Sequence, residues 1–242
     1  MTRPMSIKDR ILKLVRDPFG VLRNRWTSFS EWIRFGGSRD YSTVEYWKYR
    51  HSKYGFDLRG VGDKTKSHEE NIRLLEQGRR VFLDVCNTAG VTFPGARVLD
   101  IGCGTGFFAE VVRNNGVRDY LGIDIVDTLF EGLRIRCPGY LFERLDVSVE
   151  PLHGSYDLIL AMDVLQHIVD ENKFIFAVRN MISHLAPSGI VIISTHLGPQ
   201  RRDGFYVVRR PIEEFQRVFA EFTINKPVAY ADSFVFSLRR KH

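Results

Sequence analysis

The sequence predicts an α/β fold in which a mainly parallel sheet of seven strands has helices on both faces. From residue 95 onward, short apolar runs alternate with amphipathic runs, which is the pattern of repeated βα units. Turn residues such as Pro94-Gly95 separate these runs. One strand also ends on an acid just before a glycine-rich turn and a helix. The predicted strands are 97–101, 120–125, 140–144, 156–162, 190–195, 222–225 and 234–238, with helices at 107–114, 128–136, 173–184 and 211–219, and a turn at Pro187-Ser188-Gly189.

Composition limits the class of protein and its compartment. The chain has 242 residues, 44% hydrophobic and 26% charged, which is ordinary for a globular protein. No apolar run reaches the roughly 18–20 residues of a membrane span, and charges interrupt the N-terminal region where a signal peptide would be. The three cysteines form no Cys-x-x-Cys pair, so we expect free thiols and a cytoplasmic, reducing location, with membrane association as a further option.

The net charge of +6 is confined to residues 1–39, which hold nine Lys and Arg residues and three acidic ones. The remainder of the chain is balanced. A catalytic domain that follows long nucleic acid usually carries its own basic face, so we expect no specific nucleic-acid partner. RNA held by the basic extension stays open as an alternative substrate.

The chain divides into three predicted parts: a basic amphipathic extension at 1–39, a helical lid or cap at 40–94, and a catalytic domain at 95–242. Asp17-Pro18 and Phe19-Gly20 are expected to break the partial helical spacing of the extension. The favoured interpretation is a helix pair that packs on the core or on a second subunit of a homodimer. The alternative is a segment resting on an anionic membrane surface. Within the cap, Ser67 and Glu70 predict a capping box and a helix running to Gly90.

The glycine-rich turn after the first strand predicts a nucleotide-type ligand. Asp100 is followed by Gly102, Gly104 and Gly106, and then by a helix. Glycines allow a tight turn and let a ligand lie against bare backbone, while the helix start offers unpaired N–H groups. Asp124 ends the next strand, where a carboxylate suits the two hydroxyls of a ribose. A nicotinamide site has the spacing GxGxxG, whereas the spacing here is GxGxG.

This spacing, with its acid two residues before the first glycine, resembles motif I of the class I S-adenosylmethionine-dependent methyltransferases. Four later segments, at 121–125, 144–147, 156–168 and 185–189, resemble further motifs of that family in the same order. The resemblance implies a Rossmann-like sheet with an antiparallel last strand. It also implies S-adenosyl-L-methionine as the methyl donor and S-adenosyl-L-homocysteine as the product.

The resemblance also assigns roles at the cofactor site. The loop from Asp100 to Gly106 would hold the methionine part, Asp124 would bind the ribose, and Asp146 with the amide of Val147 would bind the adenine. The residues that the resemblance assigns to cofactor binding are Asp100, Gly102, Cys103, Gly104, Gly106, Asp124, Ile125, Asp146, Val147 and Met162.

Two histidines are the candidate catalytic bases. His167 and His196 follow the fourth and fifth strands, so both imidazoles are expected at the crevice where the cofactor binds. Asp163 would orient a base or contact the cofactor amine, and Tyr206 and Asp232 are expected on loops that reach the pocket. The remaining histidines are expected to be surface or packing residues. They are His51, His68, His153, His184 and His242.

We expect no metal site, because no adjacent pair of acids follows a strand and Asp163, His167 and Asp232 would form a poor one. The segment Asp163-Val164-Leu165-Gln166 also differs from the Asn/Asp-Pro-Pro-Tyr motif of methylases that act on DNA amino groups. It resembles the corresponding segment of methyltransferases that act on small molecules, lipids and sugars.

The run from Tyr46 to Arg50 resembles a YWxxR element that precedes motif I in bacterial methyltransferases. Trp47 would then cover the cofactor and Arg50 would meet its carboxylate, as parts of a lid. The alternative is a helix that packs its aromatics on the core. Aromatic, Asp, Asn and His side chains around a cleft suit sugars. We therefore expect O-methylation of a sugar or glycan hydroxyl with a histidine base. The alternatives are N- or C-methylation of a small metabolite or lipid, and a non-catalytic cofactor-binding protein.

Overall fold

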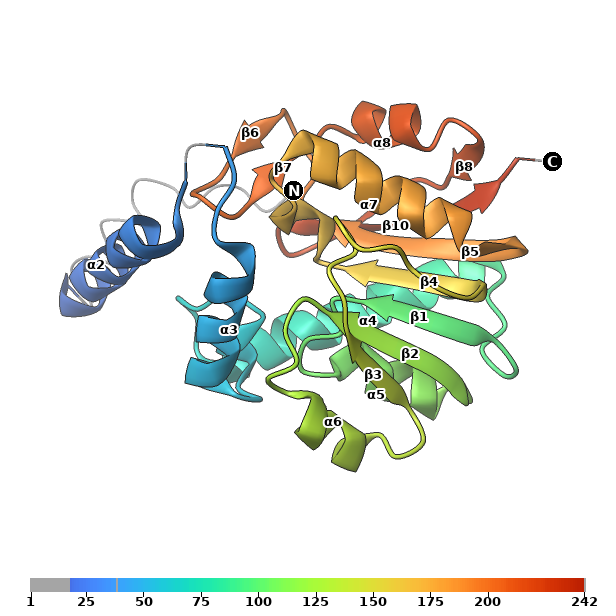
Figure 1. Ribbon diagram of the computed structural model, residues 1–242, viewed down its shortest axis with the longest axis horizontal. Helices are drawn as coiled ribbons and strands as arrows, with labels where there is room; N and C mark the ends of the chain where they lie inside the picture. Colours follow the sequence, from blue (N-terminus) through green and yellow to red (C-terminus); the bar gives the residue numbers. More distant parts are fainter. Residues whose placement is uncertain (1–17, 38, 242) are drawn as a thin grey trace.

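A sheet of eight strands runs through the centre of the molecule, with helices on both faces (Figure 1). The computed structural model describes residues 18–37 and 39–241. The sheet strands are β1 (Arg97–Ile101), β2 (Asp119–Asp124), β3 (Leu141–Arg144), β4 (Tyr156–Met162), β5 (Leu185–Thr195), β8 (Phe222–Ile224), β9 (Val228–Tyr230) and β10 (Ser233–Arg240). The helices are α2 (Pro18–Phe35), α3 (Thr43–Tyr54), α4 (His68–Ala89), α5 (Phe107–Asn114), α6 (Phe130–Arg136), α7 (Glu171–Ser183) and α8 (Ile212–Val218). Short 3₁₀ turns lie at Leu58–Gly60 and Leu165–His167, and β6 (Arg201–Arg202) pairs with β7 (Val208–Arg209) as a separate hairpin.

The strand order confirms the predicted fold class. The sheet follows the order β3-β2-β1-β4-β5-β10-β8, in which β1 to β5 pair in parallel and the last strand, β10, is antiparallel to β5 and β8. The sequence predicted these seven strands. The short strand β9 is an addition, and it pairs with the first half of β10.

One predicted turn was wrong, because Pro187-Ser188-Gly189 lies inside β5. The pairing of β4 with β5 shifts register here: Tyr156 is opposite Leu185, whereas Leu158 is opposite Ile190. The extra residues of β5 form an irregularity in the pairing. Proline is tolerated there because no regular inter-strand hydrogen bond requires its missing N–H.

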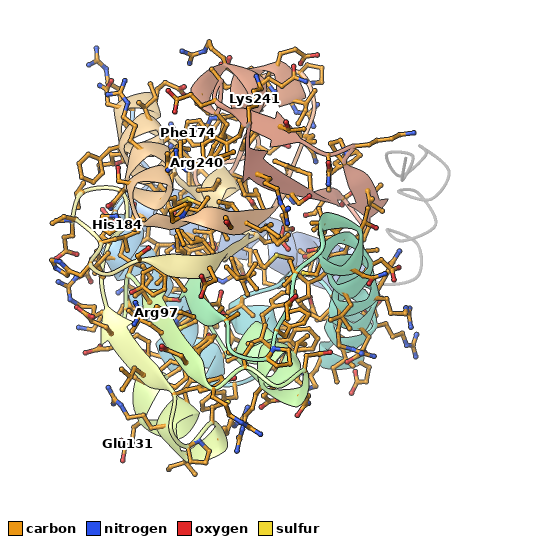
Figure 2. All side chains as sticks on the ribbon, turned by 90° about the vertical axis from the view of Figure 1, so that its right-hand side faces the viewer. Arg97, Glu131, Phe174, His184, Arg240 and Lys241 are labelled. Carbon is orange, nitrogen blue, oxygen red and sulfur yellow. The ribbon has the colours of Figure 1, made fainter. Side chains whose placement is uncertain are left out.

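Each face of the sheet has its own apolar core. Buried side chains of α4, α5 and α6 pack on one face, and buried side chains of α7 and α8 pack on the other. Phe174 of α7, labelled in Figure 2, is fully buried in the second core. Since both faces are covered, the ends of the parallel strands are the part of the sheet at which a ligand can bind.

The turn after β1 requires glycine for two separate reasons. Gly102 and Gly106 have φ values of +69° and +78°, which side chains rarely adopt. A Cβ atom at Gly102 would lie 2.3 Å from Val164, and one at Gly106 would lie 2.4 Å from Leu133. The backbone of this loop therefore lies closer to its neighbours than any side chain would allow.

Helix α2 begins at Pro18 and runs through Phe19-Gly20, so the predicted break at Phe19-Gly20 was wrong. Proline suits the first helical position, where its missing N–H costs nothing, and one glycine costs a helix only about 1 kcal/mol. Asp17 and the rest of residues 1–17 lie outside the described residues. Across the residues that are described, no helix is both long and apolar enough to cross a membrane.

Helix α4 has the predicted capping box. The Ser67 side chain accepts a hydrogen bond from the Glu70 amide at 3.1 Å, and the Glu70 carboxylate accepts one from the Ser67 amide at 2.7 Å. Gly90 ends the helix with a left-handed φ of +73°. These contacts satisfy backbone groups that would otherwise remain unpaired at the helix ends.

We expect the substitution Ser67→Ala to lower the free energy of unfolding by about 1 kcal/mol, because it removes the N-cap acceptor. Urea unfolding followed by circular dichroism measures the change. Ser52→Ala is the matched control, since Ser52 is exposed within α3, and it should change stability by less than about 0.5 kcal/mol. Equal effects of the two substitutions would contradict the assigned cap.

Candidate active site

Two cavities adjoin at the carboxyl ends of the parallel strands. The first is bounded by the glycine loop after β1 and by the residues that follow β2, β3 and β4. The second is bounded by the residues that follow β4 and β5, by segment 203–209, and by the turn between β9 and β10. Five residues line both cavities and form what we call the junction. The junction residues are Val61, Gly62, Leu75, Asp163 and His167.

Most of the residues expected to bind the cofactor line the first cavity, namely Asp100, Gly102, Cys103, Gly104, Asp124, Ile125, Val147 and Met162. Gly106 is not part of the lining and instead precedes α5 as its N-cap. The structure therefore brings together eight residues that the sequence spreads over four strand ends.

Asp146 does not line the cavity, although Leu145 and Val147 on either side of it do. One carboxylate oxygen of Asp146 accepts hydrogen bonds from the amide of Ser148 at 2.9 Å and from its hydroxyl at 2.6 Å. The side chain thus stabilises its own turn. A direct contact between Asp146 and a ligand in the first cavity stays a prediction.

Two buried carboxylates stand at the base of the first cavity. Tyr120 donates a hydrogen bond to Asp100 at 2.7 Å, and burial raises the pKa of Asp100 to about 7. Asp124 accepts hydrogen bonds from the amides of Gly104 at 3.1 Å and Val126 at 3.2 Å. Burial also raises the pKa of Asp124, while the nearby imidazole of His51 opposes that rise.

His51 lines the first cavity, a position that the sequence did not predict. It is 3% exposed, and burial lowers its pKa although Asp124 attracts the charged form. Its ring contacts that of Trp47, with the centroids 6.0 Å apart. The spacing of four residues from Trp47 to His51 places both on one helix face, and this was the signal available in the sequence.

Asp163 is the most heavily hydrogen-bonded side chain of the junction. One of its oxygens accepts hydrogen bonds from Ser194 at 2.8 Å, Ser233 at 2.7 Å and Gln166 at 3.2 Å. The other oxygen accepts one from the hydroxyl of Tyr230. Neither imidazole is among these donors. Asp163 thus joins the ends of β4, β5, β9 and β10, and it influences the two candidate bases through its charge alone.

His167 is held between two aromatic rings at the junction. Its ring lies edge-on to the ring of Trp47, with the centroids 4.9 Å apart, and stacks on the ring of Tyr206, with the centroids 5.5 Å apart. Its Nδ1 is 2.9 Å from the carbonyl oxygen of Tyr206. Because a carbonyl only accepts, Nδ1 carries the proton and Nε2 keeps its lone pair. Burial lowers the pKa of His167 to about 4, so the ring is neutral near pH 7.

His196 lines only the second cavity. Burial lowers its pKa, while Asp163, Asp232 and Asp203 favour the charged form. Its Nδ1 is buried and has no hydrogen-bond partner among the described residues. Burying an unpaired N–H is costlier than burying an unpaired lone pair, which favours the tautomer with the proton on Nε2. The surroundings of the two histidines therefore favour opposite tautomers. Nε2 of His167 would accept a hydrogen bond, and Nε2 of His196 would donate one.

The lid residues expected from the sequence occupy different cavities. Trp47 lines the first cavity, as expected for a residue that covers the cofactor. Arg50 lines the second and is 2% exposed, with its guanidinium bonded to the carbonyl oxygens of Arg59 and Gly62, the latter at 2.8 Å. A contact between Arg50 and the cofactor carboxylate stays a prediction. Because Arg50 bonds to the junction residue Gly62, such a contact would lie at the border of the two cavities.

Tyr206 and Asp232 line the second cavity, as expected. Tyr46 packs against Tyr206 with ring centroids 4.8 Å apart and is completely buried. The element from Tyr46 to Arg50 therefore packs on the core and lines the site at once. The other polar side chains of the second cavity are Asp63, Lys66, Asn71, Gln166, Asp203, Arg209, Tyr230 and Ser233.

Among the residues that the structure describes, no three His, Cys, Asp or Glu side chains gather as a metal site would require. Cys86, Cys103 and Cys137 are buried free thiols.

We expect Tyr230→Phe to lower the free energy of unfolding by about 1.5–3 kcal/mol, because it removes one donor from a charged, partly buried carboxylate. Chemical unfolding measures the loss. The matched control is Tyr156→Phe, since Tyr156 is also buried but its hydroxyl bonds to no group in the described chain. If the two variants lose the same stability, the hydroxyl of Tyr230 does not stabilise Asp163.

Comparisons with known proteins agree with this geometry. A family model described as a methyltransferase domain matches residues 69–225, well over half of the chain. A ubiquinone biosynthesis O-methyltransferase of Bordetella avium is 34% identical over 107 residues, which cover 42% of this chain and 43% of that protein. The enzyme of the same name from Neisseria meningitidis serogroup C is 30% identical over 108 residues, covering 42% and 44%. The chain thus aligns with less than half the length of these curated relatives.

Solved structures share the fold at low sequence identity. The complex of DhpI with S-adenosylhomocysteine has a TM-score of 0.61 at 17% identity, covering 82% of this chain and 95% of that one. Magnesium protoporphyrin IX methyltransferase from Synechocystis PCC 6803 has a TM-score of 0.57 at 18% identity, covering 69% and 84%. With the family match, the glycine loop and the strand order, the chain belongs to the class I S-adenosylmethionine-dependent methyltransferases.

Proposed function

We propose that this methyltransferase methylates a hydroxyl group of a small polar acceptor, first of all a sugar or glycan, and that His167 is the general base. The observation that carries the proposal is the position of His167 at the junction of the two cavities, with the lone pair of Nε2 left free by the Tyr206 contact. A base must lie where donor and acceptor meet, and it must be held in the accepting tautomer.

The residues that line the first cavity suit S-adenosylmethionine in their chemistry. When bound, this cofactor supplies an electrophilic methyl group on a sulfonium. Asp124 would accept the ribose hydroxyls, since each of its oxygens has a lone pair beyond those used by the backbone amides. Leu145 and Val147 offer an apolar slot for the adenine, and Gly102 and Gly104 present backbone without a side chain to the same cavity.

The junction gives the chain's own groups separate tasks. Nε2 of His167 would take the proton of the acceptor hydroxyl as the oxygen forms its new bond to carbon. Nε2–H of His196 would donate a hydrogen bond from the second cavity and fix the acceptor. Asp163 is not available as a base, because four donors already occupy its oxygens. Alignment of the acceptor at the junction would supply much of the rate.

Two observations favour an oxygen acceptor with several polar groups. The second cavity is lined by carboxylate, amide, hydroxyl and guanidinium groups, which suit the hydroxyls of a sugar. The relatives from Bordetella and Neisseria are named as O-methyltransferases, which supports oxygen as the methylated atom. An amine or carbon acceptor, or cofactor binding without turnover, would be an outcome against the proposal.

We expect His167→Gln to lower kcat by roughly 10²–10⁴-fold, because glutamine accepts a hydrogen bond but takes no proton. Single-turnover rates with labelled cofactor and a panel of sugars, glycans and phenols measure this loss. His196→Gln should raise KM more than it lowers kcat. The exposed His153→Gln is the control and should leave both unchanged. Full kcat in the His167 variant, with an acceptor that the wild type methylates, would exclude His167 as the base.

The pH profile provides an independent test. A base with a pKa lowered to about 4 is neutral above that value, so kcat should be flat near neutral pH. It should fall about tenfold per unit once the pH drops below the folded pKa. A protonated His196 still donates, so its titration should leave kcat unchanged. A limb rising above pH 7 would instead indicate an amine that must lose its proton, and it would contradict the proposal.

We expect Asp124→Asn to weaken the binding of S-adenosylhomocysteine by about 10- to 100-fold, which is the usual effect of losing hydrogen bonds to a charged group. Titration calorimetry measures the affinity without any acceptor. Asp119→Asn is the control, because Asp119 lies on the same strand but is exposed. Unchanged affinity in the Asp124 variant would show that the ribose binds elsewhere.

A further inference from the structure

Helix α2 presents a continuous row of large apolar side chains to solvent. Trp26, Phe29, Trp32 and Ile33 are 72%, 53%, 55% and 62% exposed. Their spacing of three, three and one residues places all four within one side of a helix. The ring centroids of Trp26 and Phe29, and of Phe29 and Trp32, are both 6.3 Å apart. We call these four residues the aromatic face.

The opposite side of the same helix is firmly packed. Glu31 and Phe35 are each 3% exposed. Glu31 forms an ion pair with Lys64, and the ring of Phe35 lies 5.5 Å from that of Tyr46. Figure 1 shows α2 at the side of the molecule, projecting away from the sheet. The aromatic face is therefore the outward side of a docked helix, and nothing else in the described chain covers it.

The sequence of α2 and the residues just after it is positively charged. Residues 18–39 hold four arginines and one glutamate. Arg34, Arg39 and Arg202 are exposed at the C-terminal end of α2, where the Arg202 guanidinium donates a hydrogen bond to the carbonyl of Arg39 at 3.1 Å. A partner that matches this surface must offer an apolar region to the aromatic side chains and negative charge to the arginines.

We propose that α2 lies in the surface of an anionic lipid bilayer, with the aromatic face inserted between the headgroups. Tryptophan and phenylalanine favour the membrane interface, and lysine and arginine attract anionic lipids. A second copy of this chain is a poorer occupant, because each copy would bring the same excess of arginines to the contact. The helix lies on the membrane and does not cross it.

The proposal is tested by sedimentation of the full chain with vesicles. One set contains phosphatidylcholine alone, and the other contains equal parts phosphatidylcholine and phosphatidylglycerol. We expect binding to the anionic vesicles, weaker binding at high salt, and a blue shift of tryptophan emission on binding. Equal binding to both sets, or no binding to either, would overturn the proposal.

A double variant, Trp26→Ala with Trp32→Ala, should weaken partitioning into the anionic vesicles by roughly tenfold or more, since two large apolar side chains no longer insert. The matched control is Ile135→Ala with Leu141→Ala, which removes two side chains that are 77% and 68% exposed on another surface. This control should bind vesicles like the wild type. Both double variants should keep the wild-type affinity for S-adenosylhomocysteine, which shows that they are folded.

The oligomeric state distinguishes a lipid bilayer from a second copy of the chain as the partner of the aromatic face. Analytical ultracentrifugation should show the same state for the wild type and for the Trp26/Trp32 variant. A wild-type dimer that becomes monomeric in this variant would overturn the proposal, because the aromatic face would then join two copies of the chain. Vesicle binding that is unchanged in the variant would overturn it as well.

Discussion

The carboxylate of Asp163 is the interaction on which the site depends. Its four donors come from the turn after β4 and from β5, β9 and β10, so one side chain sets how far apart these strand ends lie. A partly buried charge of this kind is stable only while its hydrogen bonds are all made. The left-handed backbone at Asp163, with φ of +56°, indicates that the surrounding contacts are strong enough to hold an unfavourable conformation.

In this arrangement neither imidazole donates a hydrogen bond to Asp163, and each has a different environment. His167 is fixed by a carbonyl from the loop that follows β6, whereas His196 has a buried nitrogen without a partner. The tautomers follow from these surroundings and not from the residue type. Two neutral histidines, one accepting and one donating, can both form hydrogen bonds with hydroxyl groups of an acceptor. Two protonated histidines would instead repel each other.

The sequence predicted the fold well, because alternation of apolar runs and turn residues is a local property. The glycine loop and Asp124 were predicted for the same reason. The partners of Asp163 could not be predicted, since Ser194, Tyr230 and Ser233 meet it only through strand pairing across the sheet. Pro187 misled the prediction of β5, because local turn chemistry cannot reveal a shift in register.

The aromatic contacts from Phe35 through Tyr46 and Tyr206 to His167 give the molecule a mechanical continuity between its N-terminal region and its catalytic centre. Every link is a contact between flat, stiff rings. A change in how α2 packs would alter the first of these contacts, and Tyr46 would then have to repack against the ring that stacks on His167. The packing of the first helix and the orientation of the imidazole at the junction therefore share one set of ring contacts.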